Sequence, residues 1–232
     1  MDRDSLPSSE RRSFLTRLNS GLISLAALAG VAMAQDKPAP AEHWEPVRHP
    51  KDDWFDKPSV KHRLVFDTTT MDGVGEALAF AMNFYSANKA EYGVENSELG
   101  LVIVLRHRSA AFGFNDAMWA KYGATLATRS KVEDPKTGKA PTANLYNATG
   151  YGEGLTNRGI TLETLAKQGG QFAVCALSTR ALAGQIARAA GSTTEAILAE
   201  LTANLVSNAR LVPAGVVAVS RAQERGYTLV SC

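Results

Sequence analysis

A run of seven residues that is apolar almost throughout, Leu99–Leu105 with the sequence LGLVIVL, constrains the fold more than any other stretch. A strand that is apolar on both faces has to be covered on both faces, which is the situation of a strand inside a parallel sheet. The run ends in the polar residues RHRS at 106–109. It predicts a buried parallel strand whose carboxyl end is followed by charged side chains.

Strand-like and helix-like patterns alternate along the rest of the chain. Residues 63–70 (RLVFDTTT) have an apolar, β-rich pattern, and residues 76–88 place apolar side chains at helical spacing. Further helices are expected at 115–122, 161–168, 195–206 and 215–225, and further strands at 172–177, 209–213 and 227–230. Strands that alternate with helices indicate βαβ units, so we expect an α/β fold with a mostly parallel sheet of about five strands.

The stretch at 171–188 (QFAVCALSTRALAGQIAR) joins a strand pattern to a helix pattern. Ser178 and Thr179 are residues of the kind that cap the start of a helix. Cys175 is therefore expected at the end of a strand and beside a helix N-terminus, whose partial positive charge favours a thiolate. A cysteine in such an apolar run is also a common packing residue, so a reactive and an inert Cys175 both remain open.

Polar residues gather at the carboxyl ends of the predicted strands, the edge of an open parallel sheet where ligands bind. The strand ends there are Asp67 and Thr68, Arg106 and His107, and Cys175. A neighbouring cation lowers the pKa of a thiol, and a histidine exchanges protons near neutral pH. The alternative for His107 is a hydrogen-bonded structural role. The edge thus combines an acid, two cations and a thiol.

The first 34 residues resemble a twin-arginine (Tat) export signal. The sequence has RRSFL at 11–15, a moderately apolar run at 18–31, and the small-x-small pattern AMA at 32–34. The apolar run has about fourteen residues, fewer than the roughly 20 of a membrane span. We expect a signal peptide at 1–34, the Tat machinery as export partner and a bacterial periplasmic location; an uncleaved membrane anchor is the alternative.

The charge balance is close to neutral. The 232 residues carry a formal net charge of +2, of which four arginines and three acids in the signal account for +1. The net charge of +1 that remains is not the electrostatic footprint of a nucleic-acid-binding protein. Removing 34 of the 232 residues leaves 198, enough for one domain with a substantial core.

Cys175 and Cys232 are the only cysteines, and they either pair or remain as two thiols. A disulfide would require their Cα atoms to lie within about 7 Å. The chain has no CxxC or HExxH motif and its four histidines are scattered, so no metal site is predicted. The Gly73-x-Gly75 pair lacks the third glycine and the acidic residue of a dinucleotide fingerprint, so no cofactor is predicted.

Two segments lie outside this regular pattern. Residues 35–62 are rich in Pro, charge and Trp, and they predict an extended leader held to the domain by Trp44, Trp54 and Phe55. The alternative for this leader is an exposed aromatic arm that binds a ligand. Residues 124–159 are the least regular part, and they predict a long excursion that acts as a lid or a subunit contact.

The domain at 63–232 resembles the DsrE/DsrF-like family of sulfur-relay proteins. The resemblance runs from about Arg63 to Val230 through LVFDTTT, LVIVLRH, AVCALSTRALA and, most specifically, LVPAGVVAVSRAQERGYTLV. It implies a flavodoxin-like three-layer sandwich, a homo-oligomer, and a cysteine at the position of Cys175 that accepts persulfide sulfur. This chain departs from the relay proteins in its export signal, in the leader and excursion, and in the residues Ala-Leu-Ser that follow Cys175.

Two functions are consistent with these residues. The first is periplasmic sulfur handling, in which Cys175 accepts sulfur from a small-molecule or protein donor. The second is a non-catalytic ligand-binding or assembly protein that uses the same edge with Cys175 as packing. The predicted catalytic residues are Cys175 and His107, and the predicted ligand-binding residues are Asp67, Thr68, Arg106, Asn115 and Arg180. A hydrolase is disfavoured because no nucleophile elbow or Ser-His-Asp pattern is visible.

Overall fold

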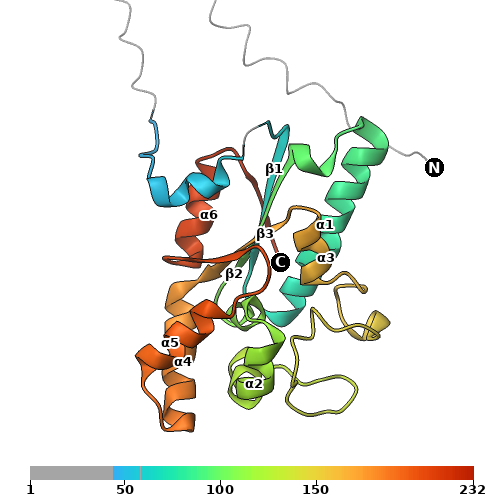
Figure 1. The fold of residues 1–232 in the computed structure, drawn as a ribbon. Coiled ribbons are helices and arrows are strands. Elements are labelled where there is room, and N and C mark those ends of the chain that lie inside the picture. The colour runs from blue at the N-terminus through green and yellow to red at the C-terminus, as the bar shows by residue number, and fades with distance from the viewer. Residues whose placement is uncertain (1–43, 58) are drawn as a thin grey trace, which may run out of the picture. The chain divides into compact units, whose positions relative to one another are not determined.

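Five parallel strands form one sheet in the part of the chain that the computed structural model describes, residues 44–57 and 59–232. They are β1 (His62–Thr68), β2 (Leu99–Leu105), β3 (Gln171–Cys175), β4 (Ala209–Val212) and β5 (Thr228–Ser231), in the order β4-β3-β2-β1-β5. This confirms the predicted α/β fold (Figure 1). The predicted signal at 1–34 and leader residues 35–43 lie outside the described residues.

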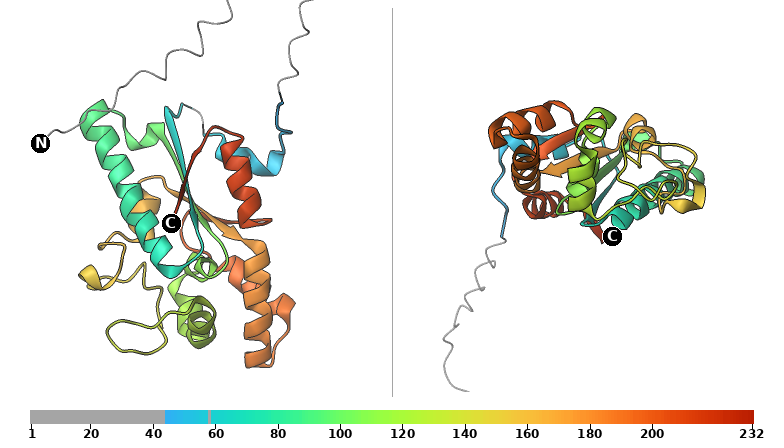
Figure 2. Two further views of the ribbon diagram at one scale, coloured as in Figure 1. Left: turned by 180° about the vertical axis from the view of Figure 1, so that it is seen from behind. Right: turned by 90° about the horizontal axis from the view of Figure 1, so that it is seen from below.

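Helices cover both faces of this sheet, as the three-layer prediction requires (Figures 1 and 2). One face carries α1 (Met71–Tyr92) and α3 (Leu162–Lys167), and the other carries α6 (Gly215–Gln223) and the 3₁₀ helix η1 (Pro50–Phe55). The chain moves outward from β1 to β4 and then returns across the sheet to β5. A right-handed return crossover places α6 opposite to the earlier helices.

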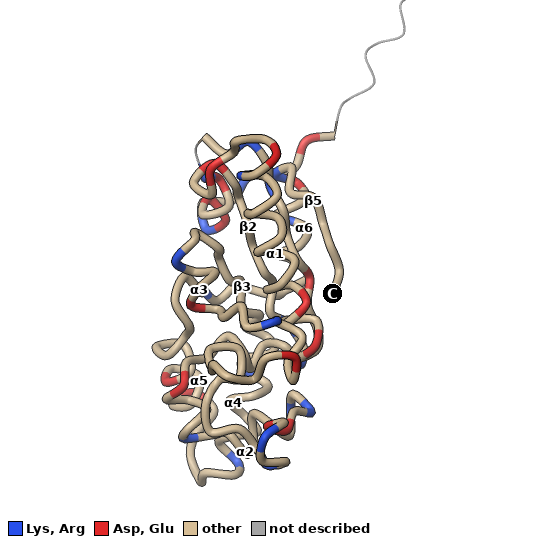
Figure 3. The backbone as a smooth tube through the Cα atoms, turned by 90° about the vertical axis from the view of Figure 1, so that its right-hand side faces the viewer, with Lys and Arg blue, Asp and Glu red and all other residues tan. Residues whose placement is uncertain are grey.

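Three helices lie beyond the carboxyl ends of the strands, as Figures 1 and 3 show: α2 (Asp116–Ser130), α4 (Ala176–Ala190) and α5 (Thr194–Ala203). Short 3₁₀ turns complete the chain: η2 (Asn96–Glu98), η3 (Ser109–Gly113) and η4 (Gly152–Gly154). Acidic and basic positions are interspersed along these elements (Figure 3). None of the described helices is long and apolar enough to cross a membrane.

The core divides into two clusters because strand side chains alternate between the faces of a sheet. On the α1 face, Ile103 of β2 and Phe172 of β3 join the larger cluster. On the α6 face, Val104 and Ala173, the next residues along the same strands, pack with Ala218 of α6. All seven residues of β2 are buried, which explains why its sequence is apolar without alternation.

The helix α1 begins at Met71, five residues before its predicted start at 76. Thr70 caps it by accepting a 3.0 Å hydrogen bond from the backbone N–H of Gly73. The glycines of the first turn permit close packing: a Cβ on Gly75 would clash with Thr156, and one on Gly73 would lie 2.7 Å from the carbonyl carbon of Cys232. The Gly-x-Gly pair therefore serves contacts within the chain.

The predicted excursion at 124–159 is partly helical, because α2 continues to Ser130 instead of ending at 122. The remainder is held by buried polar contacts. The Asn144 amide donates 2.9 Å hydrogen bonds to the carbonyls of Phe112 and Phe114, and the Tyr146 hydroxyl donates one of 2.7 Å to the Met71 carbonyl. These bonds attach the excursion to η3 and to the start of α1, so it is an integral part of the domain.

The described part of the leader is not fully extended, since Pro50 starts the 3₁₀ helix η1. As predicted, Phe55 anchors it: this ring is 1% exposed, and its carbonyl accepts a 2.8 Å hydrogen bond from the Tyr227 hydroxyl. Trp54 stacks on Phe55 with their ring centroids 3.7 Å apart, as the prediction requires. Trp44 is 71% exposed, so it does not help to hold the leader. Tyr227 belongs to the segment RAQERGY at 221–227, which therefore contacts the leader.

Candidate functional site

Cys175 is the last residue of β3 and also the N-cap of α4. The sequence predicted Ser178 or Thr179 as the cap, so the helix starts earlier than expected. The difference places the cysteine directly at the helix N-terminus instead of one turn before it. The residue is 6% exposed, so the thiol is buried at the sheet edge.

The N-termini of α4 and α6 both lie close to the Cys175 thiol, although its sulfur makes no cap hydrogen bond to α4. The backbone N–H groups of Ser178 and Leu177 come from α4, and that of Gly215 comes from the first residue of α6. Burial, the largest effect, raises the pKa of the thiol, but the Ser178 hydroxyl and these three N–H groups together outweigh it. The pKa of Cys175 is lowered below its ordinary value. Such donors stabilise a thiolate more than a thiol.

Arg106 brings a fixed positive charge to the same edge. Its guanidinium donates two 2.7 Å hydrogen bonds to the Asp67 carboxylate in a bidentate pair. The bonds to Asp67 raise the pKa of Arg106; burial opposes this, and the charges of Asp67 and Cys175 add to the rise. A bidentate pair holds the guanidinium plane in one orientation. The positive charge beside Cys175 is therefore positioned in advance.

Asp67, Arg106 and Cys175 meet because all three belong to the same face of the sheet. Asp67 and Cys175 come two residues after Val65 and Ala173, both of which pack on the α6 face. Thr68, the next residue of β1, belongs to the opposite face of the sheet and is fully buried. Its hydroxyl donates a 2.8 Å hydrogen bond to the Val104 carbonyl of β2. This predicted ligand-binding residue therefore bonds to the neighbouring strand.

Ser109 fastens the loop that carries Arg106. Its hydroxyl oxygen accepts a 2.9 Å hydrogen bond from the Arg106 backbone N–H and lies 2.9 Å from the Thr68 carbonyl oxygen and 3.0 Å from the Thr68 hydroxyl. Ser109 is fully buried. It ties the end of β2 to the end of β1, and so holds Arg106 close to Asp67.

His107 lies at the exposed side of the site in a left-handed backbone conformation, with φ of 57°. Its backbone N–H donates a 3.0 Å hydrogen bond to the Ser178 hydroxyl oxygen. The pKa of the imidazole is lowered. Desolvation is the largest cause, and the positive charges of Arg129, Arg108 and Arg106 lower the pKa further. His107 is therefore neutral at pH 7 and able to accept a proton.

Ser178 links His107 to Cys175. A hydroxyl has one hydrogen to donate and two lone pairs that accept. Because the His107 N–H occupies the acceptor side, the Ser178 hydrogen is free to point at the sulfur, in agreement with the hydrogen bond that lowers the pKa of Cys175. Sequence reasoning treated Ser178 as a helix cap and missed this role.

Removing the Ser178 hydroxyl should make Cys175 less acidic. In Ser178→Ala, on a Cys232→Ser background, we expect the pH profile of Cys175 alkylation to move to higher pH, because a thiolate that loses a donor forms at a higher pKa. The rate of labelling by a neutral reagent between pH 5 and 10 measures this. Ser220→Ala, which removes a hydroxyl of α6 that is bonded to Glu224, is the matched control. An unchanged profile in Ser178→Ala would contradict the assignment.

Two predicted site residues have their partners elsewhere. The Asn115 side chain caps α2 by accepting from the Met118 N–H at 3.3 Å, and its amide donates to Asn204 at 3.3 Å. Arg180 is exposed and lies 3.9 Å from Glu195 of α5. The geometry thus gathers Asp67, Arg106, His107 and Cys175 and directs Asn115 and Arg180 to helix contacts.

The two cysteines are free in the structure. Cys232 follows β5, and three strand spacings separate β5 from β3. At about 4.8 Å each these spacings amount to about 14 Å, twice the reach of a disulfide. Burial raises the pKa of the Cys232 thiol, and the charges of Glu76 and Asp67 raise it further, so the two thiols differ in character.

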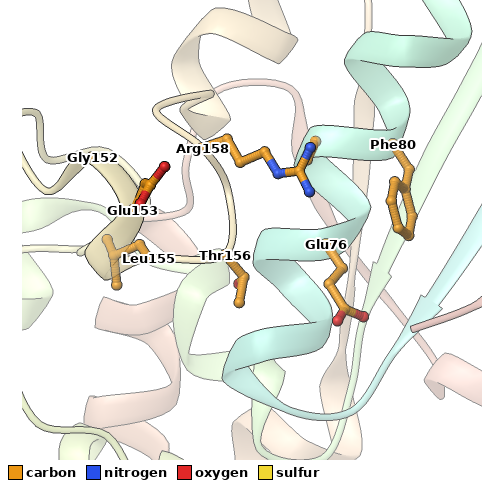
Figure 4. A pocket seen from close by; sticks show the side chains of 8 residues that line it. Glu76, Phe80, Gly152, Glu153, Leu155, Thr156 and Arg158 are labelled. Atoms are coloured by element: carbon orange, nitrogen blue, oxygen red, sulfur yellow. The ribbon is translucent and has the colours of Figure 1, made fainter.

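A separate pocket of about 730 Å³ lies between α1 and the segment around η4 (Figure 4). Phe80 and Leu155 supply apolar surface, while Glu76, Glu153 and Arg158 supply charge. In Figure 4 the Arg158 side chain extends from the loop toward α1. None of its lining residues belongs to the Cys175 group, so this pocket is distinct from the thiol site.

No cluster of three or more His, Cys, Asp or Glu side chains suited to a metal ion occurs among residues 44–57 and 59–232. Comparisons of the chain with protein-family models, curated proteins and solved structures found no match.

Proposed function

We propose that this chain is an exported DsrE-like protein that handles sulfur in the periplasm by accepting sulfane sulfur on Cys175. The observation that carries the proposal is the position of Cys175 at the end of β3 and the start of α4, where the Ser178 hydroxyl and the backbone N–H groups of α4 and α6 lower the pKa of its thiol. The thiolate, and not the thiol, is the sulfur nucleophile. Arg106, held by Asp67, adds a positive charge that stabilises the anion before and after transfer.

The proposed step is a transfer between two sulfur atoms without net oxidation. The Cys175 thiolate attacks the outer sulfur of a donor R–S–S⁻ and forms a new S–S bond. The bond between the two donor sulfurs breaks, and the inner sulfur leaves with the electron pair as R–S⁻. Cys175 then carries a persulfide anion, which the N–H groups of Ser178 and Gly215 would stabilise as they stabilise the thiolate. Neutral His107 is available to take up a proton if the donor enters as R–S–SH.

Intact mass tests the proposal directly. After incubation with a low-molecular-weight persulfide, the wild type should gain a reducible mass of about 32, one sulfur atom, mapped to Cys175. Cys175→Ser should lose the adduct completely and Cys232→Ser should retain it. An adduct on Cys232 alone, or none on either cysteine, would refute the sulfur-carrier function. Intact mass of protein from the periplasm also tests export, since removal of the signal shortens the chain by 34 residues.

The second candidate is a non-catalytic ligand-binding or assembly protein, with Cys175 as packing. The low exposure of Cys175 and the separate pocket beside Phe80 favour it. A protein of this kind would give two slowly alkylated thiols and no sulfur adduct. The same mass measurement therefore separates the two functions, and size-exclusion chromatography with light scattering tests the proposed homo-oligomer.

A further inference from the structure

Three basic side chains lie together at the outer side of the thiol site: His107, Arg108 and Arg129. His107 and Arg108 follow β2 directly, whereas Arg129 comes from the last turn of α2. Ser130, the next residue, donates a 3.0 Å hydrogen bond from its hydroxyl to the Arg108 carbonyl. That bond fixes the end of α2 to the loop, so the segments that carry Arg108 and Arg129 are joined directly beside these two residues.

These two arginines differ from Arg106 in having no acidic partner. No carboxylate among the described residues lies within 4.0 Å of Arg108 or Arg129, whereas Asp67 forms an ion pair with Arg106. Both side chains are half-buried, and the Nε of Arg129 is shielded from solvent without a hydrogen-bond acceptor in the described part of the chain. A shielded guanidinium donor is costly unless it is paired. An anion that binds the remaining N–H groups of the two guanidinium groups would supply the missing negative charge.

His107 lies between the two arginines and the thiol site. Its backbone N–H donates a hydrogen bond to the Ser178 hydroxyl, and the Ser178 side chain is one of the groups that lower the pKa of Cys175. The effect of Arg129 and Arg108 on the pKa of the imidazole agrees with their position beside it. A molecule bound by Arg108 and Arg129 would therefore lie beside His107, the residue whose backbone N–H contacts Ser178 at the thiol site.

We propose that Arg108 and Arg129 bind an oxyanion, a carboxylate, phosphate or sulfonate, on a small molecule that enters the Cys175 site. Guanidinium groups present a planar set of donors that matches these groups, which makes arginine the usual residue for this task. The role of this molecule as the sulfur donor depends on the function proposed above. The anion site itself does not, because it concerns only Arg108 and Arg129.

Two thiol reagents of equal length and opposite charge test the site on Cys232→Ser protein. These are 2-sulfonatoethyl methanethiosulfonate and its trimethylammonioethyl counterpart, which place their charge two carbon atoms beyond the reacting sulfur. We expect Cys175 to react faster with the anionic reagent, and inorganic sulfate to slow that reaction saturably at constant ionic strength. The rate ratio cancels changes in the thiolate fraction, because both reagents require the same thiolate.

Arg108→Gln and Arg129→Gln should each lower the ratio of anionic to cationic rates by roughly tenfold, the loss of about one charge-assisted hydrogen bond. Lysine at either position should restore part of it. Arg188→Gln is the control: Arg188 is exposed in the last turn of α4, at the opposite end from Cys175, and its removal changes the net charge equally. It should leave the ratio unchanged.

A ratio that is equal in wild type and both glutamine variants, without competition by sulfate, would overturn the anion site. If neither reagent reaches Cys175, calorimetry with inorganic sulfate decides instead: weaker binding to the variants supports the site, and equal or absent binding refutes it. The two proposals fail separately. A normal charge preference without a sulfur adduct would refute the sulfur-carrier function alone, and an adduct without charge preference would refute the anion site alone.

Discussion

Gly215→Ala is expected to destabilise the protein by about 1–3 kcal/mol, the usual cost of overpacking, although alanine is the better helix former. A Cβ on Gly215 would lie 2.5 Å from the Arg106 Cβ and 2.8 Å from its Cδ. The Arg106 side chain cannot easily move aside, since two hydrogen bonds hold its guanidinium to Asp67. The start of α6 should therefore shift outward. Urea denaturation measures the loss of stability.

The same substitution should make Cys175 less acidic. The Gly215 N–H is one of the groups that lower the pKa of the thiol, and an outward shift of α6 would withdraw it. On a Cys232→Ser background, the pH profile of alkylation should move to higher pH together with the loss of stability. A destabilised variant with an unchanged profile would show that α6 does not act on the thiol.

Gly184→Ala is the matched control because Gly184 is also a helical glycine without a positive φ. A Cβ there would meet its nearest side-chain atoms, on Arg188 and Thr194, at 3.7 Å, which is ordinary contact. In the interior of α4 the exchange should stabilise the protein by about 0.5–1 kcal/mol. Gly215→Ala and Gly184→Ala should thus change stability in opposite directions. Stabilisation by both would contradict the close contact at Arg106.

Arg225→Ala is expected to cost about 3 kcal/mol of unfolding free energy, mainly by creating a cavity and also by removing a half-buried ion pair. The Arg225 side chain is fully buried, and its Nε donates a 3.1 Å hydrogen bond to Asp56, which is 42% exposed. The guanidinium lies 5.9 Å from the centre of the Phe55 ring. Truncation therefore removes the support beneath η1. The midpoint and slope of chemical denaturation measure the effect.

Arg188→Ala provides the comparison, because Arg188 is exposed and its loss should change stability by no more than about 0.5 kcal/mol. Proteolysis adds a second readout: cleavage near 46–57 should become faster in Arg225→Ala if η1 detaches. A loss below about 1 kcal/mol, with unchanged proteolysis, would mean that η1 is held mainly by Phe55 and Tyr227.

Local pattern was sufficient for the elements of the sheet. The apolar run Leu99–Leu105 is β2 with the predicted bounds, since a strand covered on both faces needs no polar position. The bounds of helices were less well predicted. Thr70 starts α1 earlier than its apolar pattern, and Cys175, which makes no side-chain cap, starts α4 before Ser178. Helix starts depend on backbone donors and close contacts that the apolar period does not contain.

By itself the sequence determined the α/β class and the placement of Asp67, Arg106, His107 and Cys175 at one edge, because parallel strands end at the same edge of a sheet. Only the tertiary structure decided their partners. The order β4-β3-β2-β1-β5 brings Gly215, forty residues away along the chain, to Cys175 and separates Cys232 from it. Strand order and helix rotation depend on long-range packing, which leaves no local pattern in the residues that meet.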